Sequence, residues 1–409
     1  MTERARRILL ADADAFYVAV ARLVDPEGAG RAKLLIVGGS AERRGVVTSA
    51  SYEARAYGVT SAMPMARALR LCPQAMVVPV PWETCWEKGR DIRHVLEEWA
   101  PTVEQASSDE CYLEMSGTER LYHDEPLATT AHRIRDAVRE RTGLAVSLGG
   151  GTSRLVAKLA AGRAKPRAGE PGLGVHIVAP GTEAEFLAGF TLAELPFVGP
   201  RFQERLGRHG WHHVKDVQGL DVAVLRRALG EREGQWLWER VRGIDSATVT
   251  PWREPQSISR DETFAQDLHT TDELARELLR QVDRATADLR SDGLVARTVT
   301  VKLRDYDFTT RQAARTLPDP VLSDRAVYAV ARGLLERLRN ARHVPARLIG
   351  VALSGLMRAG NIKQITLFDE PGAESIETER DRVLARVIDT VRHRFGEKAL
   401  RRGPVLPTP

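Results

Sequence analysis

The sequence predicts an α+β protein of several domains. Strand-like and helix-like segments alternate through the first part of its 409 residues, and a later region combines alternating strands with two amphipathic helices. At 43% hydrophobic residues, a chain of this length can bury more than one core.

The first elements predicted along the chain are a strand, a helix and a second strand. An apolar run at residues 7–11 predicts a buried strand, residues 16–23 predict the start of a helix, and residues 34–39 predict another strand. Residues 145–150 predict a further strand. Residues 152–166 combine a Thr or Ser cap, apolar side chains at helical spacing and a terminating proline, which is typical of a helix.

Glycine and proline divide the middle of the chain. The glycine-rich residues 167–174 predict a loop, and residues 192–245 predict short, compact helices separated by glycine. Prolines within residues 248–256 argue against a regular element, so we expect a linker there.

The last packed region predicts a sheet that helices cover on one face. Residues 297–304 and 347–355 alternate between apolar and polar side chains, while residues 272–290 and 325–339 form two amphipathic helices. The other face would be open to a ligand. Residues 290–363 hold about 14 basic and about 6 acidic side chains, which suits either phosphate binding or a solvated charged face.

Charge and cysteine content narrow the class of protein. A net charge of +5 and a pI near 9.2 permit a polyanionic partner. Asp12 and Asp14 interrupt the N-terminal apolar stretch too early for a signal peptide, and no apolar run is long enough to span a bilayer. Cys72, Cys85 and Cys111 cannot all pair and lack zinc spacing. We therefore expect structural thiols, a cytoplasmic location and no membrane contact.

Carboxylates are the first candidate chemical groups. Asp12 ends an apolar strand, where an acidic side chain is costly to bury without a balancing positive charge such as a metal ion. Asp109 and Glu110 are adjacent in a strand-like segment, so both reach one metal only near a turn or bend; a plain turn or solvated edge is the alternative. Three carboxylates suffice for magnesium, and two such ions can drive phosphoryl transfer.

A second candidate cluster mixes hydroxyls and arginines at residues 43–59. Arg55 could bind phosphate oxygens in a forked geometry, with Tyr52 and Ser49 donating hydrogen bonds, or the segment could be a surface helix with a routine ion pair. The glycines at residues 149–151 lack the following Lys-Ser or Lys-Thr of a phosphate-binding P-loop.

Four ordered motifs resemble the Y-family DNA polymerases, and the nearest similarity is to the DinB or polymerase IV branch. They are DADAFY at 12–17, TSASYEAR at 48–55, SSDECYLE at 107–114 and the segment that ends in Lys165 and Pro166. The resemblance spans nearly the whole chain. It implies a right-hand fold of palm, fingers and thumb with an additional α/β little finger that grips DNA.

The resemblance also implies domain boundaries. They are a palm at 1–17 and 78–166, fingers at 18–77, a thumb with a helix-hairpin-helix at 167–245, a linker at 246–257, a little finger at 258–358 and a tail at 359–409.

The roles of individual residues follow from the same resemblance. Asp12, Asp109 and Glu110 match the ligands of two Mg²⁺ ions, and Glu110 also matches a catalytic position. Tyr17 matches the steric gate that selects deoxynucleotides. The positions that hold the triphosphate are matched by Ser49, Tyr52, Arg55 and Lys165. The implied partners are primer-template DNA and deoxynucleoside triphosphates.

Some positions depart from the family pattern. Cys111 stands where alanine is usual, and Ser49 stands where threonine is common. Glu114 stands where aspartate is usual, and Arg154 replaces a lysine with its charge kept. Phe197, in LPFVGP, replaces the first glycine of a helix-hairpin-helix turn whose amides normally approach DNA phosphate, which puts that contact in doubt.

The segment KQITLFDE resembles the peptide by which bacterial polymerases bind the sliding clamp. Its Gln364, Leu367 and Phe368 match the pattern, with an amphipathic loop as the alternative. Leu367 and Phe368 would anchor in an apolar pocket and raise processivity. Residues 377–396 predict a helix of unknown role.

The sequence is compatible with three functions. The first is an active, error-prone translesion DNA polymerase, a bacterial cytoplasmic monomer. The second is a catalytically silent family member that recruits repair partners through the clamp, although all three acidic ligands are present. The third is a non-enzymatic DNA-binding protein built on the helix-hairpin-helix, which leaves the N-terminal carboxylates unexplained.

Overall fold

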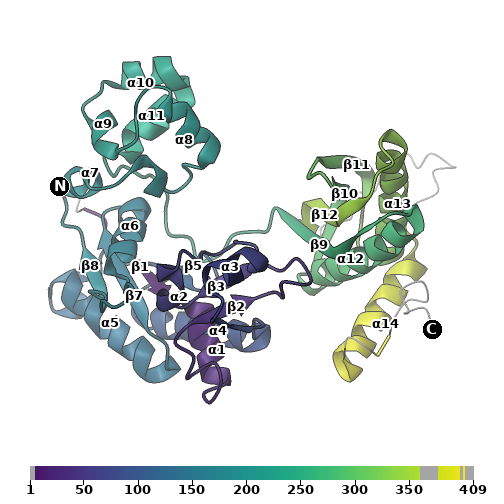
Figure 1. Cartoon of the computed structure of the whole chain (residues 1–409), viewed down its shortest axis with the longest axis horizontal. Helices are drawn as coiled ribbons and strands as arrows, with labels where there is room; N and C mark the ends of the chain where they lie inside the picture. Colours follow the sequence, from purple (N-terminus) through teal and green to yellow (C-terminus); the bar gives the residue numbers. More distant parts are fainter. Residues whose placement is uncertain (1–4, 360–375, 397–398, 401–409) are drawn as a thin grey trace. The chain divides into compact units, whose positions relative to one another are not determined.

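The computed structural model describes residues 5–359, 376–396 and 399–400. The chain divides into two compact units. The first comprises the residues up to Arg253 without Glu42–Arg44, and the second comprises Glu42–Arg44 with the residues from Glu254 onward. Each unit mixes helices and strands, which confirms the predicted α+β class (Figure 1). Within the described residues, no helix is both long and apolar enough to cross a bilayer.

A five-stranded sheet forms the centre of the first unit, in the order β5-β6-β1-β7-β8. Its strands are β1 (Ile8–Ala13), β5 (Thr102–Gln105), β6 (Glu110–Glu114), β7 (Val146–Gly151) and β8 (Val175–Ile177). The central strand β1 is buried on both faces and pairs antiparallel with β6 and β7. The strands predicted at residues 7–11 and 145–150 are therefore confirmed, and α1 (Phe16–Val24) confirms the helix predicted at residues 16–23.

Helices cover both faces of this sheet. Helices α4 (Trp82–Glu97) and α5 (Leu127–Thr142) share a core with Leu9 and Ala11 of β1. On the opposite face, α6 (Arg154–Ala164) packs against Ile8 and Leu10. Helix α6 begins at a Ser153 cap and ends before Pro166, as the sequence predicts.

Gly149 allows α6 to approach the sheet closely. A Cβ atom at this position would lie 1.9 Å from the backbone nitrogen of Ala161. Contacts that short cannot be accommodated by side-chain motion, because the opposing atom belongs to the helix backbone. The glycines at residues 149–151 therefore serve close packing in this fold.

A small three-stranded sheet and three helices complete the N-terminal part of the first unit. The sheet has the order β3-β2-β4. Its elements and the neighbouring helices are β2 (Leu35–Gly38), β3 (Val47–Ala50), β4 (Met76–Val78), α1 (Phe16–Val24), α2 (Tyr52–Ala56) and α3 (Met65–Leu71).

Short helices form the rest of the first unit around a core of their own. They are α7 (Glu183–Ala188), α8 (Pro200–Gly207), α9 (Val214–Gln218), α10 (Val222–Leu229) and α11 (Glu231–Arg240), with the 3-10 turn η2 (Leu192–Glu194). A second 3-10 turn, η1 (Glu119–Tyr122), follows β6, and its Tyr122 joins the core of the central sheet. Leu155 and Leu159 of α6 join the core of the helical region. Residues 248–256 form no helix or strand, in agreement with the predicted irregular segment.

The second unit contains a four-stranded antiparallel sheet in the order β11-β10-β12-β9. Its strands are β9 (Ser257–Leu268), β10 (Leu294–Asp305), β11 (Thr310–Val321) and β12 (Ala346–Arg358). Val299, Val301 and Leu303 are fully buried against α12 (Thr271–Ser291) and α13 (Asp324–Ala341). The predicted alternation and the two amphipathic helices are confirmed.

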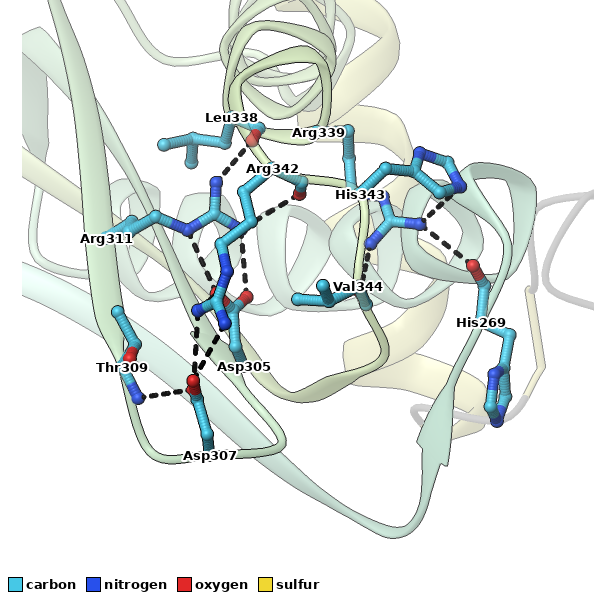
Figure 2. A network of polar contacts seen from close by, with 10 residues as sticks. All are labelled: His269, Asp305, Asp307, Thr309, Arg311, Leu338, Arg339, Arg342, His343 and Val344. Atoms are coloured by element: carbon cyan, nitrogen blue, oxygen red, sulfur yellow. Dashed lines mark hydrogen bonds and ion pairs between the residues drawn. The ribbon is translucent and has the colours of Figure 1, made fainter.

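A buried ionic network ties the β10–β11 hairpin to the end of α13 (Figure 2). Asp305 is fully buried and accepts hydrogen bonds from Arg311 and Arg342, each at 2.8 Å. Arg342 also binds Asp307 at 2.8 Å. Because both oxygens of the buried carboxylate have charged partners, its burial is compensated, and the network fixes the hairpin.

The helix predicted over residues 377–396 is present as α14 (Glu379–Phe395). Ion pairs attach it to α12 of the same unit. Arg290 binds both carboxylate oxygens of Asp389, at 2.6 and 2.7 Å, and Arg392 binds Asp283 at 2.8 Å. Such forked pairs fix geometry as well as supplying energy.

Candidate active site

The central sheet brings the three predicted carboxylates to one end of β1. Asp12 lies near the end of β1, and its register partner on β6 is Glu110. Asp109 immediately precedes β6, where its carbonyl oxygen accepts a hydrogen bond from Ala13 at 2.9 Å. Since β6 begins at Glu110, Asp109 belongs to the turn rather than to the strand. This bend lets the adjacent side chains of Asp109 and Glu110 both lie near Asp12, whose pKa they both raise. In a regular strand the two side chains would point to opposite faces of the sheet.

Two lysines balance the charge of these carboxylates. Lys165 Nζ lies 2.6 Å from Asp12 Oδ1, and Lys158 Nζ lies 2.6 Å from both oxygens of Glu110. Ser107 Oγ donates to Asp109 Oδ1 at 2.7 Å. Lys165 was predicted from the motif, whereas Lys158 was missed. The available signal is its position seven residues, about two helical turns, before Lys165, the residue that directly follows α6.

The electrostatic state of Asp12 is unusual. Its side chain is largely buried, and burial raises its pKa from 3.8 to about 6. Lys165 opposes this rise, while the negative charges of Glu110 and Asp109 add to it. A cation beside these groups would relieve both the burial cost and the mutual repulsion.

Within the described part of the chain, no three His, Cys, Asp or Glu side chains converge as a ready-made metal cluster. At this site the lysine contacts hold Asp12 and Glu110. The donor set nevertheless consists of carboxylate oxygens, which Mg²⁺ prefers, and the pKa of Asp12 is raised first by burial and further by the charges of Glu110 and Asp109, both of which a bound cation would offset. By these two criteria the residues fit a magnesium site.

Tyr17 lies in the first turn of α1, directly after the carboxylate motif. Ala15 caps this helix with φ +45°, a left-handed conformation that is strained for any residue with a Cβ atom. Asp14, between Asp12 and the helix, accepts a hydrogen bond from Ser147 Oγ at 2.8 Å, and burial raises its pKa. The Tyr17 hydroxyl lies 2.9 Å from Ser108 Oγ in the loop before β6.

The predicted phosphate-binding side chains lie together on β3 and α2. Arg55 donates from Nη2 to Ser49 Oγ at 3.4 Å and from Nε to the Ala50 carbonyl at 2.9 Å. Its guanidinium also lies 5.0 Å from the centre of the Tyr52 ring. The Tyr52 hydroxyl is buried without a hydrogen-bond partner among the described residues, and burial raises its pKa.

The departures from the family pattern have distinct environments. Cys111 is buried in the sheet, and Glu114 pairs with Arg6 at 3.1 Å. Arg154 pairs with Glu104 and lies 4.1 Å from the Tyr112 ring centre. Phe197 has φ +69° and is 89% exposed. The turn thus keeps a glycine-type conformation while presenting a large apolar side chain.

Three family descriptions match the chain. They are the impB/mucB/samB family at residues 11–162, the C-terminal domain of that family at residues 255–367, and the DNA polymerase-iota thumb domain at residues 193–245. Similar full-length relatives include the DNA polymerase IV of Halorhodospira halophila, 37% identical over 351 residues that cover 86% of this chain and 95% of the relative. The DNA polymerase IV of Dehalococcoides mccartyi is 33% identical over 398 residues, 97% of each chain. The chain belongs to the DNA polymerase IV branch of the Y family.

Solved structures support the same fold. A Y-family DNA polymerase chimera matches with a TM-score of 0.75 at 22% identity, over 86% of this chain and 99% of the other. DinB from Sulfolobus solfataricus matches with a TM-score of 0.56 at 23% identity, over 85% and 98%. The right-hand Y-family architecture predicted from the motifs is therefore confirmed.

Proposed function

We propose that this chain is a translesion DNA polymerase, in which Asp12, Asp109 and Glu110 form the reaction centre. It adds deoxynucleotides to a primer 3′ end on a damaged or undamaged template. The observation that carries the proposal is the meeting of three carboxylates at one end of β1, where burial and mutual repulsion leave negative charge for a cation to balance.

The carboxylates would hold two Mg²⁺ ions. When bound, such a pair of ions activates the attacking hydroxyl and stabilises the leaving oxygen in phosphoryl transfer. Asp12 and Glu110 are fixed by the β1–β6 pairing, so the protein supplies the ligands in a set position. Lys165 and Lys158 provide positive charge at the same place, and Lys165 matches the residue that would approach the triphosphate.

Arg55, Tyr52 and Ser49 would bind the triphosphate. Arg55 uses Nε and Nη2 within the protein, which leaves Nη1 available among its described contacts. The Tyr52 hydroxyl is a buried donor that has no partner among the residues the structure describes, and such a group costs free energy until a ligand accepts its hydrogen bond. Both features support an anionic ligand with several acceptor oxygens.

Tyr17 would act as the sugar gate. An aromatic ring beneath the incoming nucleotide leaves no room for a 2′-hydroxyl, so the enzyme selects deoxynucleotides. Replacing Tyr17 by Ala should admit ribonucleotides in single-nucleotide incorporation. Unchanged selection would mean that another group forms the gate.

The second unit would bind the DNA duplex. Thr298, Thr300, Lys302 and Arg304 alternate with the buried residues of β10, so they lie on the face that the helices leave uncovered. Basic and hydroxyl side chains on an open sheet suit phosphate contacts that are independent of sequence. The domain boundaries given above, with a little finger at 258–358, stay a prediction.

The sliding clamp is a further proposed partner. Gln364, Leu367 and Phe368 lie outside the described residues, so this proposal depends on the sequence motif alone. We also propose a monomeric, cytoplasmic enzyme, consistent with its bacterial polymerase IV relatives and with three free, buried cysteines. A silent recruiting role is less favoured, because all three carboxylates are retained.

Primer extension tests the proposal. The purified chain should extend a primed template with Mg²⁺ and deoxynucleotides, and should continue past a template abasic site. The Asp109→Ala variant should bind the same DNA with similar affinity but extend it at least about 10²-fold more slowly. Extension at the unmodified rate would exclude Asp109 from the reaction centre.

A further inference from the structure

The Tyr17 side chain is held from three directions. Its hydroxyl lies 2.9 Å from Ser108 Oγ, which is hydrogen-bond distance. The Phe16 ring meets it edge-on with centroids 5.2 Å apart, and the Trp82 ring meets it edge-on at 6.0 Å. The aromatic contacts restrain the body of the ring, while the Ser108 contact is the polar restraint at its far end.

Ser108 is itself held in place by the loop before β6. The amide of Ala106 donates to the Glu110 carbonyl at 2.9 Å, and the amide of Glu110 donates to Ser107 Oγ at 3.1 Å. Helix α4 passes directly beside this loop at Gly89, where a Cβ atom would lie 2.7 Å from the Ser108 carbonyl oxygen. These contacts fix the backbone position of Ser108, from which its hydroxyl reaches Tyr17.

The two ends of this contact belong to different parts of the site. Tyr17 lies on α1, whose first turn is set by the left-handed Ala15. Ser108 directly precedes Asp109, and its hydroxyl also lies 3.5 Å from Asp109 Oδ1. The hydrogen bond thus connects the helix that carries the proposed gate with the loop that carries a proposed metal ligand.

We propose that Ser108 is a positioning residue that holds the Tyr17 hydroxyl and thereby sharpens discrimination between deoxyribose and ribose. This inference rests on the proposed gate role of Tyr17. A ring anchored at its hydroxyl cannot rotate away from an incoming 2′-hydroxyl, whereas a ring without that anchor yields more easily. A typical hydrogen bond corresponds to about a 2- to 12-fold change in an equilibrium, which sets the expected loss of discrimination.

The test measures kcat and KM for a deoxynucleotide and the matching ribonucleotide on an undamaged primed template. The variants are Ser108→Ala, Tyr17→Phe and the two combined. Each single variant removes the same hydrogen bond, one from the Ser108 side and the other from the Tyr17 side. Ser108→Thr keeps the hydroxyl. Ser107→Ala is the matched control, because Ser107 binds Asp109 and the loop but has no contact with Tyr17.

Ser108→Ala and Tyr17→Phe should each lower the ratio of kcat/KM values for deoxyribonucleotide over ribonucleotide by about 2- to 12-fold. The double variant should show no further decrease. Ser108→Thr and Ser107→Ala should keep the ratio of the unmodified chain, whatever they do to the overall rate. An unchanged ratio in Ser108→Ala, or additive losses in the double variant, would overturn the inference.

The Tyr17→Ala variant distinguishes failure of the gate role of Tyr17 from failure of the positioning role of Ser108. If Tyr17→Ala leaves sugar selection intact, the gate assignment itself is wrong. If Tyr17→Ala abolishes selection while Ser108→Ala preserves it, Tyr17 is the gate and Ser108 does not position it.

Discussion

Replacing Asp12 by Asn should stabilise the metal-free protein while abolishing its activity. Burial raises the pKa of Asp12 from 3.8 to about 6 in the folded chain. Because the folded pKa exceeds the unfolded value, the ionised carboxylate destabilises the fold. Well below pH 3.8 it is protonated in both states and costs nothing. The cost grows as the pH rises between 3.8 and about 6, and it is complete above that range.

The gain in stability follows from the unfolded and folded pKa values of Asp12. Each tenfold change in proton affinity corresponds to about 1.4 kcal/mol. The difference between 3.8 and about 6 therefore costs the folded state about 3 kcal/mol at neutral pH. About half of that cost, on the order of 1 kcal/mol, should develop between pH 5 and pH 7.5. An amide has nearly the shape of the carboxylate and carries no such cost.

Urea denaturation followed by tryptophan fluorescence would measure this difference. All 7 tryptophans precede Arg253, so the signal reports on the first unit. In the presence of a chelator, Asp12→Asn should gain stability relative to the unmodified chain as the pH rises from about 5 to about 7.5. Mg²⁺ at about a hundredfold its dissociation constant should stabilise the unmodified chain by about 2.7 kcal/mol and the variant much less. A stability difference that does not change with pH would refute this account of Asp12.

Three other changes test other parts of the structure. Arg55→Ala should raise KM for deoxynucleotides about tenfold or more in steady-state kinetics, with Arg55→Lys intermediate; an unchanged KM would contradict a triphosphate contact. Gly149→Ala should destabilise the first unit by about 1–3 kcal/mol or more in the same urea assay, because its Cβ would lie 1.9 Å from Ala161 N; an unaffected midpoint would mean that α6 can move away. Deleting residues 364–368 should shorten extension products only when the clamp is present, and equal loss without the clamp would indicate misfolding.

The sequence predicts the elements of this fold well where the hydrophobic pattern is regular. The strand at residues 297–304 alternates cleanly, and its apolar residues are fully buried in the structure. The helix over residues 152–166 carries both its cap and its terminating proline. These signals are local, so a single pass along the chain detects them.

The contacts that organise the site join residues far apart in the chain, and the local residue pattern does not reveal them. Lys158 binds Glu110 across 48 positions, and Tyr17 contacts Ser108 across 91. Such pairings depend on sheet register and helix placement, which no residue pattern encodes directly. Phe197 is a different case. Its side chain gives no hint of a positive φ, and only the surrounding turn requires that conformation.

The most direct test of the proposed reaction centre is single-turnover incorporation of one deoxynucleotide on a primed template. The unmodified chain would be compared with Asp12→Asn, Asp109→Asn and Glu110→Gln over a range of Mg²⁺ concentrations, with DNA affinity measured in parallel. We predict that each variant loses at least about 10²-fold in rate and keeps its affinity for DNA. A variant that incorporates the nucleotide within a few-fold of the unmodified rate would contradict the assignment of that carboxylate.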